Sequence, residues 1–252
     1  MTNYITLNKN TFLKEAQGFI EFLINKFNDK DGINLSTEIS NYHWPKGEKG
    51  FRFEETYEMI KRLREKFSNA ISLENEDDIL NLCTEILNWG GVGVAKKNLI
   101  HIENMKSKSE LLQVLKKAQN LIKAEEIIVD GAIPTNSGFS KIYTCLYERF
   151  VIYDSRVAAA MCFLMKQFYS KDSIPETIKL GKADFQSADQ RDPGPEFPMI
   201  SGNDKKYLES NIKAAWIIEK LAMENPKFDF KLEKLIFAYQ TAFFVKGKNL
   251  PF

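Results

Sequence analysis

The stretch "NSGFSKIYTCLYERFVIYDSRVAAAM", residues Asn136 to Met161, decides the fold that we predict for this sequence. Its apolar run FVIY ends at Asp154, and an alanine-rich segment of helical composition follows directly. An aspartate in that position is a favoured N-cap, because its side chain accepts hydrogen bonds from free amides of the first helical turn. The same amides favour the ionised carboxylate. The pattern therefore predicts a fixed negative charge at the start of a helix.

The first part of the stretch combines a glycine with a small polar residue and a cation. We predict a tight turn at Gly138, Ser140 and Lys141, followed by a helix whose free amides and dipole hold a phosphate group. Arg156, close behind Asp154, is suited to pairing with a phosphate or with a carboxylate. Two simpler interpretations stay open. Lys141 is then a solvated lysine on a helix face, and Asp154 is an N-cap without a further role.

Most of the remaining chain is predicted to be helical, because apolar residues recur at spacings of three and four. A glycine-rich segment after residue 89 ends one of these helices. The segment 125–134 is a candidate for a short strand, and 171–203 is a loop too long to be only a connector. The predicted helices cover about 10–27, 53–67, 76–89, 107–123, 205–223 and 231–245.

The composition limits the classes of function. The chain has 252 residues, 44% of them hydrophobic, and a net charge of +1, so bulk charge gives no sign of nucleic acid. Three scattered cysteines exclude a four-cysteine iron–sulfur cluster and favour a reducing compartment. Two distant histidines argue against a histidine-based zinc site. No apolar run approaches the ~20 residues of a membrane span, and the first residues lack the basic-then-apolar pattern of a secretion signal. We expect a cytoplasmic protein without metal or cofactor and without a membrane partner.

The order of glycine, lysine and a later aspartate at a helix start resembles the helix-hairpin-helix superfamily of DNA glycosylases. Within it, the chain is most similar to proteins with the 8-oxoguanine DNA glycosylase fold. The residues that carry the resemblance are Gly138-Phe139-Ser140-Lys141 and Tyr153-Asp154-Ser155-Arg156-Val157. The resemblance implies a mainly α, two-lobed helical domain over 1–252, with the hairpin and the catalytic aspartate in 135–170. Ser140 stands where the family hairpin carries a second glycine.

The resemblance also implies an activity. Enzymes of this superfamily extrude a base from double-stranded DNA and hydrolyse its N-glycosidic bond, leaving an abasic site. By resemblance, Asp154 is the catalytic carboxylate and Lys141 the candidate nucleophile of a bifunctional enzyme with lyase activity. Gly138, Ser140 and Arg156 would contact DNA. We expect a monomer that acts on a modified or damaged base. Because the chain departs from the repair pattern, hypermodified cytosines of phage DNA are a candidate target, which would make the protein part of antiviral defence.

Two further segments combine aromatic rings with cations, as nucleic-acid interfaces do. In "LNWGGVGVAKKN", Trp89 is a candidate to stack on a base, and Lys96 and Lys97 are candidates for phosphate contacts. In "NYHWPKGEKGFRFEE", Trp44 is a candidate pocket residue. The alternatives are a buried tryptophan at a helix end and a loop that packs its aromatic rings on the core.

A turn-rich segment, "QRDPGPEFPMISG", supplies the last candidates for a base pocket. Gln190 and Arg191 have side chains that make bidentate hydrogen bonds with base edges, and Phe197 lies among turn-forming residues. The alternative is a plain surface loop. For the whole chain, the alternatives are a non-catalytic helix-hairpin-helix DNA-binding protein and a helical interaction protein without a DNA role.

Overall fold

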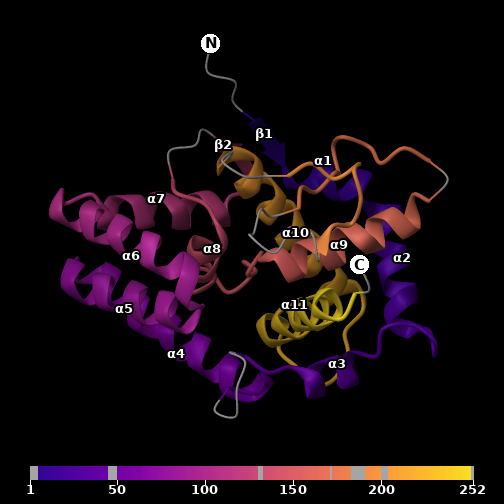
Figure 1. Ribbon diagram of the computed structural model, residues 1–252, viewed down its shortest axis with the longest axis horizontal. Coiled ribbons are helices and arrows are strands. Elements are labelled where there is room, and N and C mark those ends of the chain that lie inside the picture. The colour runs from indigo at the N-terminus through magenta and orange to yellow at the C-terminus, as the bar shows by residue number, and fades with distance from the viewer. Residues whose placement is uncertain are drawn as a thin grey trace.

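The computed structural model is mainly α-helical (Figure 1). It describes residues 5–44, 50–129, 133–170, 172–182, 191–199 and 204–250. Eleven helices and a two-stranded sheet make up the secondary structure of these residues. Their bounds are β1 Ile5–Asn8, α1 Lys9–Glu15, α2 Gln17–Asn28, α3 Leu35–Asn41, α4 Phe53–Ser72, α5 Glu76–Trp89, α6 Val92–Ser107, α7 Leu111–Lys123, β2 Glu126–Val129, α8 Ser137–Thr144, α9 Ser155–Phe168, α10 Asp204–Glu224 and α11 Leu232–Lys248.

The predicted helical regions are confirmed, with differences at the helix ends. The helix predicted at 76–89 has the bounds of α5, and 10–27 is divided at Ala16 into α1 and α2. The helix predicted to begin at Ser107 begins instead at Leu111, because a turn at 108–110 separates α6 from α7. The strand expected within 125–134 is β2, which pairs antiparallel with β1.

The helices pack in two groups (Figure 1). The α4–α8 group is continuous in sequence: α5 packs on α4, α6, α7 and α8, and α6 also packs on α8. The terminal group combines both ends of the described chain, with α1–α3 packed against α9–α11. Contacts between α4 and α11 join the groups, and β1 of the terminal group pairs with β2 beside α7.

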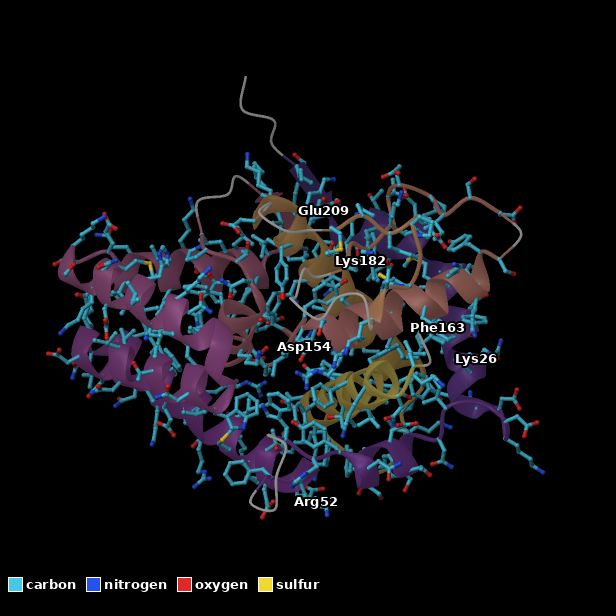
Figure 2. The ribbon with its side chains drawn as sticks, in the orientation of Figure 1. Lys26, Arg52, Asp154, Phe163, Lys182 and Glu209 are labelled. Carbon is cyan, nitrogen blue, oxygen red and sulfur yellow. The ribbon has the colours of Figure 1, made fainter. Side chains whose placement is uncertain are left out.

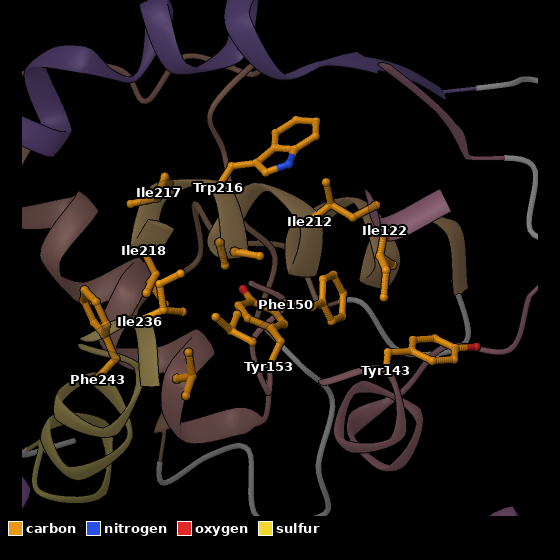
Figure 3. Packing of buried hydrophobic residues seen from close by; sticks show 14 of the residues in the cluster. Ile122, Tyr143, Phe150, Tyr153, Ile212, Trp216, Ile217, Ile218, Ile236 and Phe243 are labelled. Atoms are coloured by element: carbon orange, nitrogen blue, oxygen red, sulfur yellow. The ribbon is translucent and has the colours of Figure 1, made fainter. Parts of the chain in front are cut away.

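The segment 150–154 crosses from α8 to α9 and so connects the two groups. It lies in the hydrophobic core, and Figure 3 shows Phe150 and Tyr153 among side chains of α10 and α11. It has no strand partner, so side chains satisfy its buried backbone groups, as buried amides and carbonyls require. Asn211 Nδ2 donates to Val151 O (3.0 Å), Gln240 Oε1 accepts from Ile152 N (2.8 Å), and Tyr207 donates to Tyr153 O.

The predicted turn at Gly138 is wrong. Gly138, Ser140 and Lys141 lie inside α8, and the element before α8 is the strand β2 rather than a helix. The helix begins before Gly138 because Asn136 caps it: the Asn136 side-chain oxygen accepts hydrogen bonds from Gly138 N (2.8 Å) and Phe139 N (3.1 Å). Glycine is required here for space: a Cβ at Gly138 would lie 2.0 Å from Asn98 Nδ2.

Among the described helices, none combines the length and the apolar composition that crossing a membrane requires.

Candidate active site

Asp154 lies where the connecting segment enters α9, between the two groups of helices (Figure 2). Its backbone is extended, and its Oδ1 accepts from Arg156 N (2.9 Å) and Val157 N (3.2 Å), so the predicted N-cap is confirmed. The side chain is only 4% exposed. Because the backbone on its N-terminal side is held by α10 and α11, the carboxylate has a fixed position.

The second carboxylate oxygen of Asp154 faces Arg156. Arg156 Nε lies 3.3 Å from Asp154 Oδ2. The guanidinium also lies over two rings, 4.2 Å from the centroid of Trp44 and 4.4 Å from that of Phe244. Such planar contacts suit arginine and add cation–π attraction. Arg156 was predicted to contact a DNA phosphate or a carboxylate, and in the structure it pairs with the candidate catalytic one.

Lys141 is buried on α8, with 7% of its surface exposed, so the interpretation as a solvated lysine is wrong. Its Nζ donates to Ser137 O (2.9 Å). Its methylene chain lies against Gly90, where a Cβ would be 2.6 Å from Lys141 Cδ. No carboxylate of the described residues lies within ion-pair distance of this amine.

The environment of Lys141 favours the neutral amine. Burial lowers the pKa of Lys141 to about 8, the charge of Asp154 opposes this change, and the charge of Arg156 adds to it. Desolvation acts in this direction because a charged ammonium loses its hydration when buried. The neutral amine, which a lysine nucleophile requires, is therefore a minority form at pH 7 but far more populated than for an exposed lysine.

Two tyrosines that the sequence analysis did not select lie near Asp154. Burial, followed by the negative charge of Asp154, raises the pKa of Tyr207. The pKa of Tyr42 is raised by burial as well, and Asp154 adds to this effect. Both phenols are therefore neutral at physiological pH. The aromatic loop around Trp44 was a usable signal for Tyr42, whereas nothing in the pattern of α10 distinguishes Tyr207 from a core residue.

The remaining DNA-contact candidates are not all accessible. Gly138 and Ser140 are buried in α8, and the Ser140 hydroxyl donates to Ser137 O (3.0 Å). Lys96 and Lys97 are exposed on α6, as phosphate-binding residues would be.

Only some of the residues predicted to line a base pocket lie near Asp154. Trp44 and Trp89 are half-buried, and neither buried indole N–H has an acceptor within the described part of the chain. Arg191 joins the site, since its Nη1 lies 3.5 Å from Ser155 Oγ. Phe197 instead is buried in the hydrophobic core. Gln190 lies outside the described residues.

The side chains of this site can support nucleophilic and electrostatic catalysis. A fixed carboxylate pairs with a guanidinium that stacks on the Trp44 indole, and a buried amine lies within electrostatic reach of both charges. Over the described residues, no set of three histidine, cysteine, aspartate or glutamate side chains is placed to hold a metal ion. Comparisons with known protein families, with curated proteins and with solved structures give no match.

Proposed function

We propose that the protein is a DNA glycosylase with a two-lobed helical fold, acting on a modified or damaged base. The observation that carries the proposal is that one site contains both a fixed, buried carboxylate, Asp154, and a buried amine, Lys141. Among the described residues, Lys141 has no ion-pair partner. The three cysteines are free and buried, in agreement with action in the reducing cytoplasm.

The proposed reaction needs little more than these groups. The target nucleotide is extruded from the duplex. The bond between C1′ and the base nitrogen breaks, and the base leaves with the bonding electrons. The sugar then carries positive charge, which a fixed carboxylate stabilises, as in glycoside hydrolysis. Water adds to C1′ and loses its proton towards Asp154. In a bifunctional enzyme, the neutral Lys141 amine attacks C1′ in place of water.

The position of Gly138 inside α8 changes the expected DNA contact. Because Gly138 and Ser140 are buried, we assign the phosphate contacts to the exposed Lys96 and Lys97 rather than to a hairpin at Gly138. Single lysines of this kind act as point charges for phosphate groups and carry no sequence information. Recognition of the base is therefore assigned to the half-buried indoles of Trp44 and Trp89, whose N–H groups have no acceptor among the described residues.

A base-release assay tests the proposal. Purified protein is incubated with ordinary DNA, oxidised DNA and phage DNA that carries modified cytosines, and abasic sites are revealed by alkali. We expect breaks on one of these substrates, and their loss in Asp154→Asn, which keeps a side chain able to cap α9. Strand breaks without alkali that disappear in Lys141→Met would add the lyase step.

Glu219→Gln is the matched control for Asp154→Asn. Glu219 is a buried carboxylate of α10 that pairs with Lys9 (2.7 Å) and Arg149 (2.9 Å) rather than with the site. It should release base as the unmodified protein does. No abasic sites on any substrate, with DNA still bound, would favour the non-catalytic DNA-binding protein. Absence of salt-dependent DNA binding would favour the helical interaction protein, since phosphate contacts release counterions.

A further inference from the structure

Asp154 lies within electrostatic reach of Arg156, Lys141 and Arg191, and it makes an ion pair with Arg156 but not with Lys141. Arg156 contacts both carboxylate oxygens: its backbone N donates to Oδ1 (2.9 Å) and its Nε lies 3.3 Å from Oδ2. Lys141, whose pKa responds to the charge of Asp154, donates instead to Ser137 O. Pairing would offset part of the desolvation cost of a buried carboxylate and a buried amine that interact electrostatically.

Arg156 is held in this position from several sides. Trp44 and Phe244 contact the faces of its guanidinium. Its backbone is fixed too, because α11 passes so close that a Cβ at Gly247 would lie 1.9 Å from Arg156 O. A side chain that is fixed by two rings loses little further freedom on pairing with a carboxylate. Arg156 is therefore better placed than Lys141 to neutralise Asp154.

We propose that Arg156 is a positioning residue that binds Asp154 so that Asp154 and Lys141 do not form an ion pair with each other. Its role in catalysis rests on the proposed function, whereas the arrangement itself does not. A lysine ion-paired with Asp154 would be protonated, and a protonated amine has no electron pair with which to attack C1′. Arg156 thus occupies the carboxylate and leaves the Lys141 amine without a carboxylate partner in one site.

The groups that surround Lys141 are consistent with this role. Asp154 and Arg156, both at the start of α9, are the charged groups that act on its pKa. On its other sides, α5 contributes Gly90 and α8 contributes the carbonyl of Ser137. The groups around Asp154 itself are Tyr42 and Tyr207, which are uncharged phenols, and Arg191, whose pKa is lowered by burial and then by Arg156.

A titration of Lys141 followed by nuclear magnetic resonance tests the proposal without DNA. Lysine labelled with ¹³C at Cε reports protonation of each amine, and the signal of Lys141 is assigned from its absence in Lys141→Met. We expect a midpoint near pH 8 in the unmodified protein. In Arg156→Gln the midpoint should rise by at least about one pH unit, a tenfold tighter hold on the proton. Arg156→Lys, which keeps the positive charge, should restore much of the original midpoint.

A second pair of variants measures how much of the midpoint shift depends on the Asp154 carboxylate. With Asp154→Asn already present, Arg156→Gln should raise the midpoint far less, because no ion pair can form. An unchanged midpoint in Arg156→Gln, or an equal rise with and without Asp154, would overturn the proposal. Should Arg156→Gln fail to fold, Phe244→Leu, which removes one ring contact, is expected to raise the midpoint in the same direction, and an unchanged value overturns the proposal as well.

The titration tests the role of Arg156, and the base-release assay tests the glycosylase activity, so either proposal can be refuted without the other. A protein that releases no base but shows the shifted midpoint keeps the Arg156–Asp154–Lys141 arrangement and loses the glycosylase assignment. A protein that releases base with an unchanged midpoint in Arg156→Gln keeps the assignment and loses the role of Arg156. In a bifunctional enzyme, the adduct trapped with borohydride at pH 7 should fall about tenfold in Arg156→Gln and recover as the pH is raised.

Discussion

Replacing Lys141 with methionine should make the protein more stable while it removes the candidate nucleophile. Methionine has a similar length and fills the channel beside Gly90, but it carries no charge to desolvate. The pKa of Lys141 falls from 10.5 to about 8 in the folded protein. Each pKa unit corresponds to about 1.4 kcal/mol, so a protonated Lys141 destabilises the folded state by about 3 kcal/mol. Loss of the hydrogen bond to Ser137 O offsets about 1 kcal/mol of the gain.

The net gain of about 2 kcal/mol should raise Tm by about 4–8 °C at neutral pH, given ~2–4 °C per kcal/mol for a chain of this size. The pH dependence follows from the sign of the change. The folded pKa is lower than the unfolded one, so between pH 8 and 10.5 the unfolded state binds more protons and the unmodified protein gains stability. The advantage of Lys141→Met is therefore complete below pH 8 and disappears above about pH 10.5.

Thermal unfolding of both proteins from pH 6 to pH 10.5 measures this difference. Lys213→Met is the matched control, because Lys213 is also buried but pairs with Glu209 (2.6 Å). That variant should lose stability at neutral pH, since it removes the closer of the two lysines that pair with the buried Glu209 carboxylate and leaves only Lys206, at 3.2 Å. A Lys141→Met protein that is less stable at pH 7, or whose gain is the same at every pH, would refute the reasoning.

Two other substitutions test the packing around the site. Gly247→Ala should cost about 1–3 kcal/mol, because the new Cβ would meet the Arg156 carbonyl and force α9 and α11 apart; a Tm equal to that of the unmodified protein would contradict this contact. Asn136→Ala should cost about 1–2 kcal/mol, since it removes a cap with two amide bonds and leaves buried Asn98 without its partner. Asn34→Ala, which removes an exposed cap from α3, is its control and should cost less in the same denaturant titration.

The helices were predictable wherever one face is apolar and the ends carry signals. The bounds of α5 follow from Asn75 as N-cap and Gly90 at the end. In contrast, α6 was missed because the glycines after Trp89 indicate an end but not a new beginning. Gly91 has a φ of 120°, which lets the chain turn directly into α6.

The site was predictable only where its residues are close in sequence. Asp154 was found because an N-cap is a local pattern. The contact of Arg156 with Trp44 and Phe244 was not, since periodicity shows which face of a helix is apolar but not which faces meet. For Lys141, the sequence singled out the residue together with Asp154, but its burial was not predicted, because lysines are seldom buried.

The division of the helices into a continuous and a discontinuous group has a consequence for synthesis on the ribosome. Helices α4–α8 find their packing partners within one uninterrupted stretch, so they can fold as soon as that stretch has emerged. Helices α1 and α2 are made first but pack on α9 and α10, which are made more than a hundred residues later. The apolar faces of the nascent N-terminal segment therefore remain exposed until α9 and α10 have been synthesised. This segment is the part of the chain that a chaperone is expected to protect.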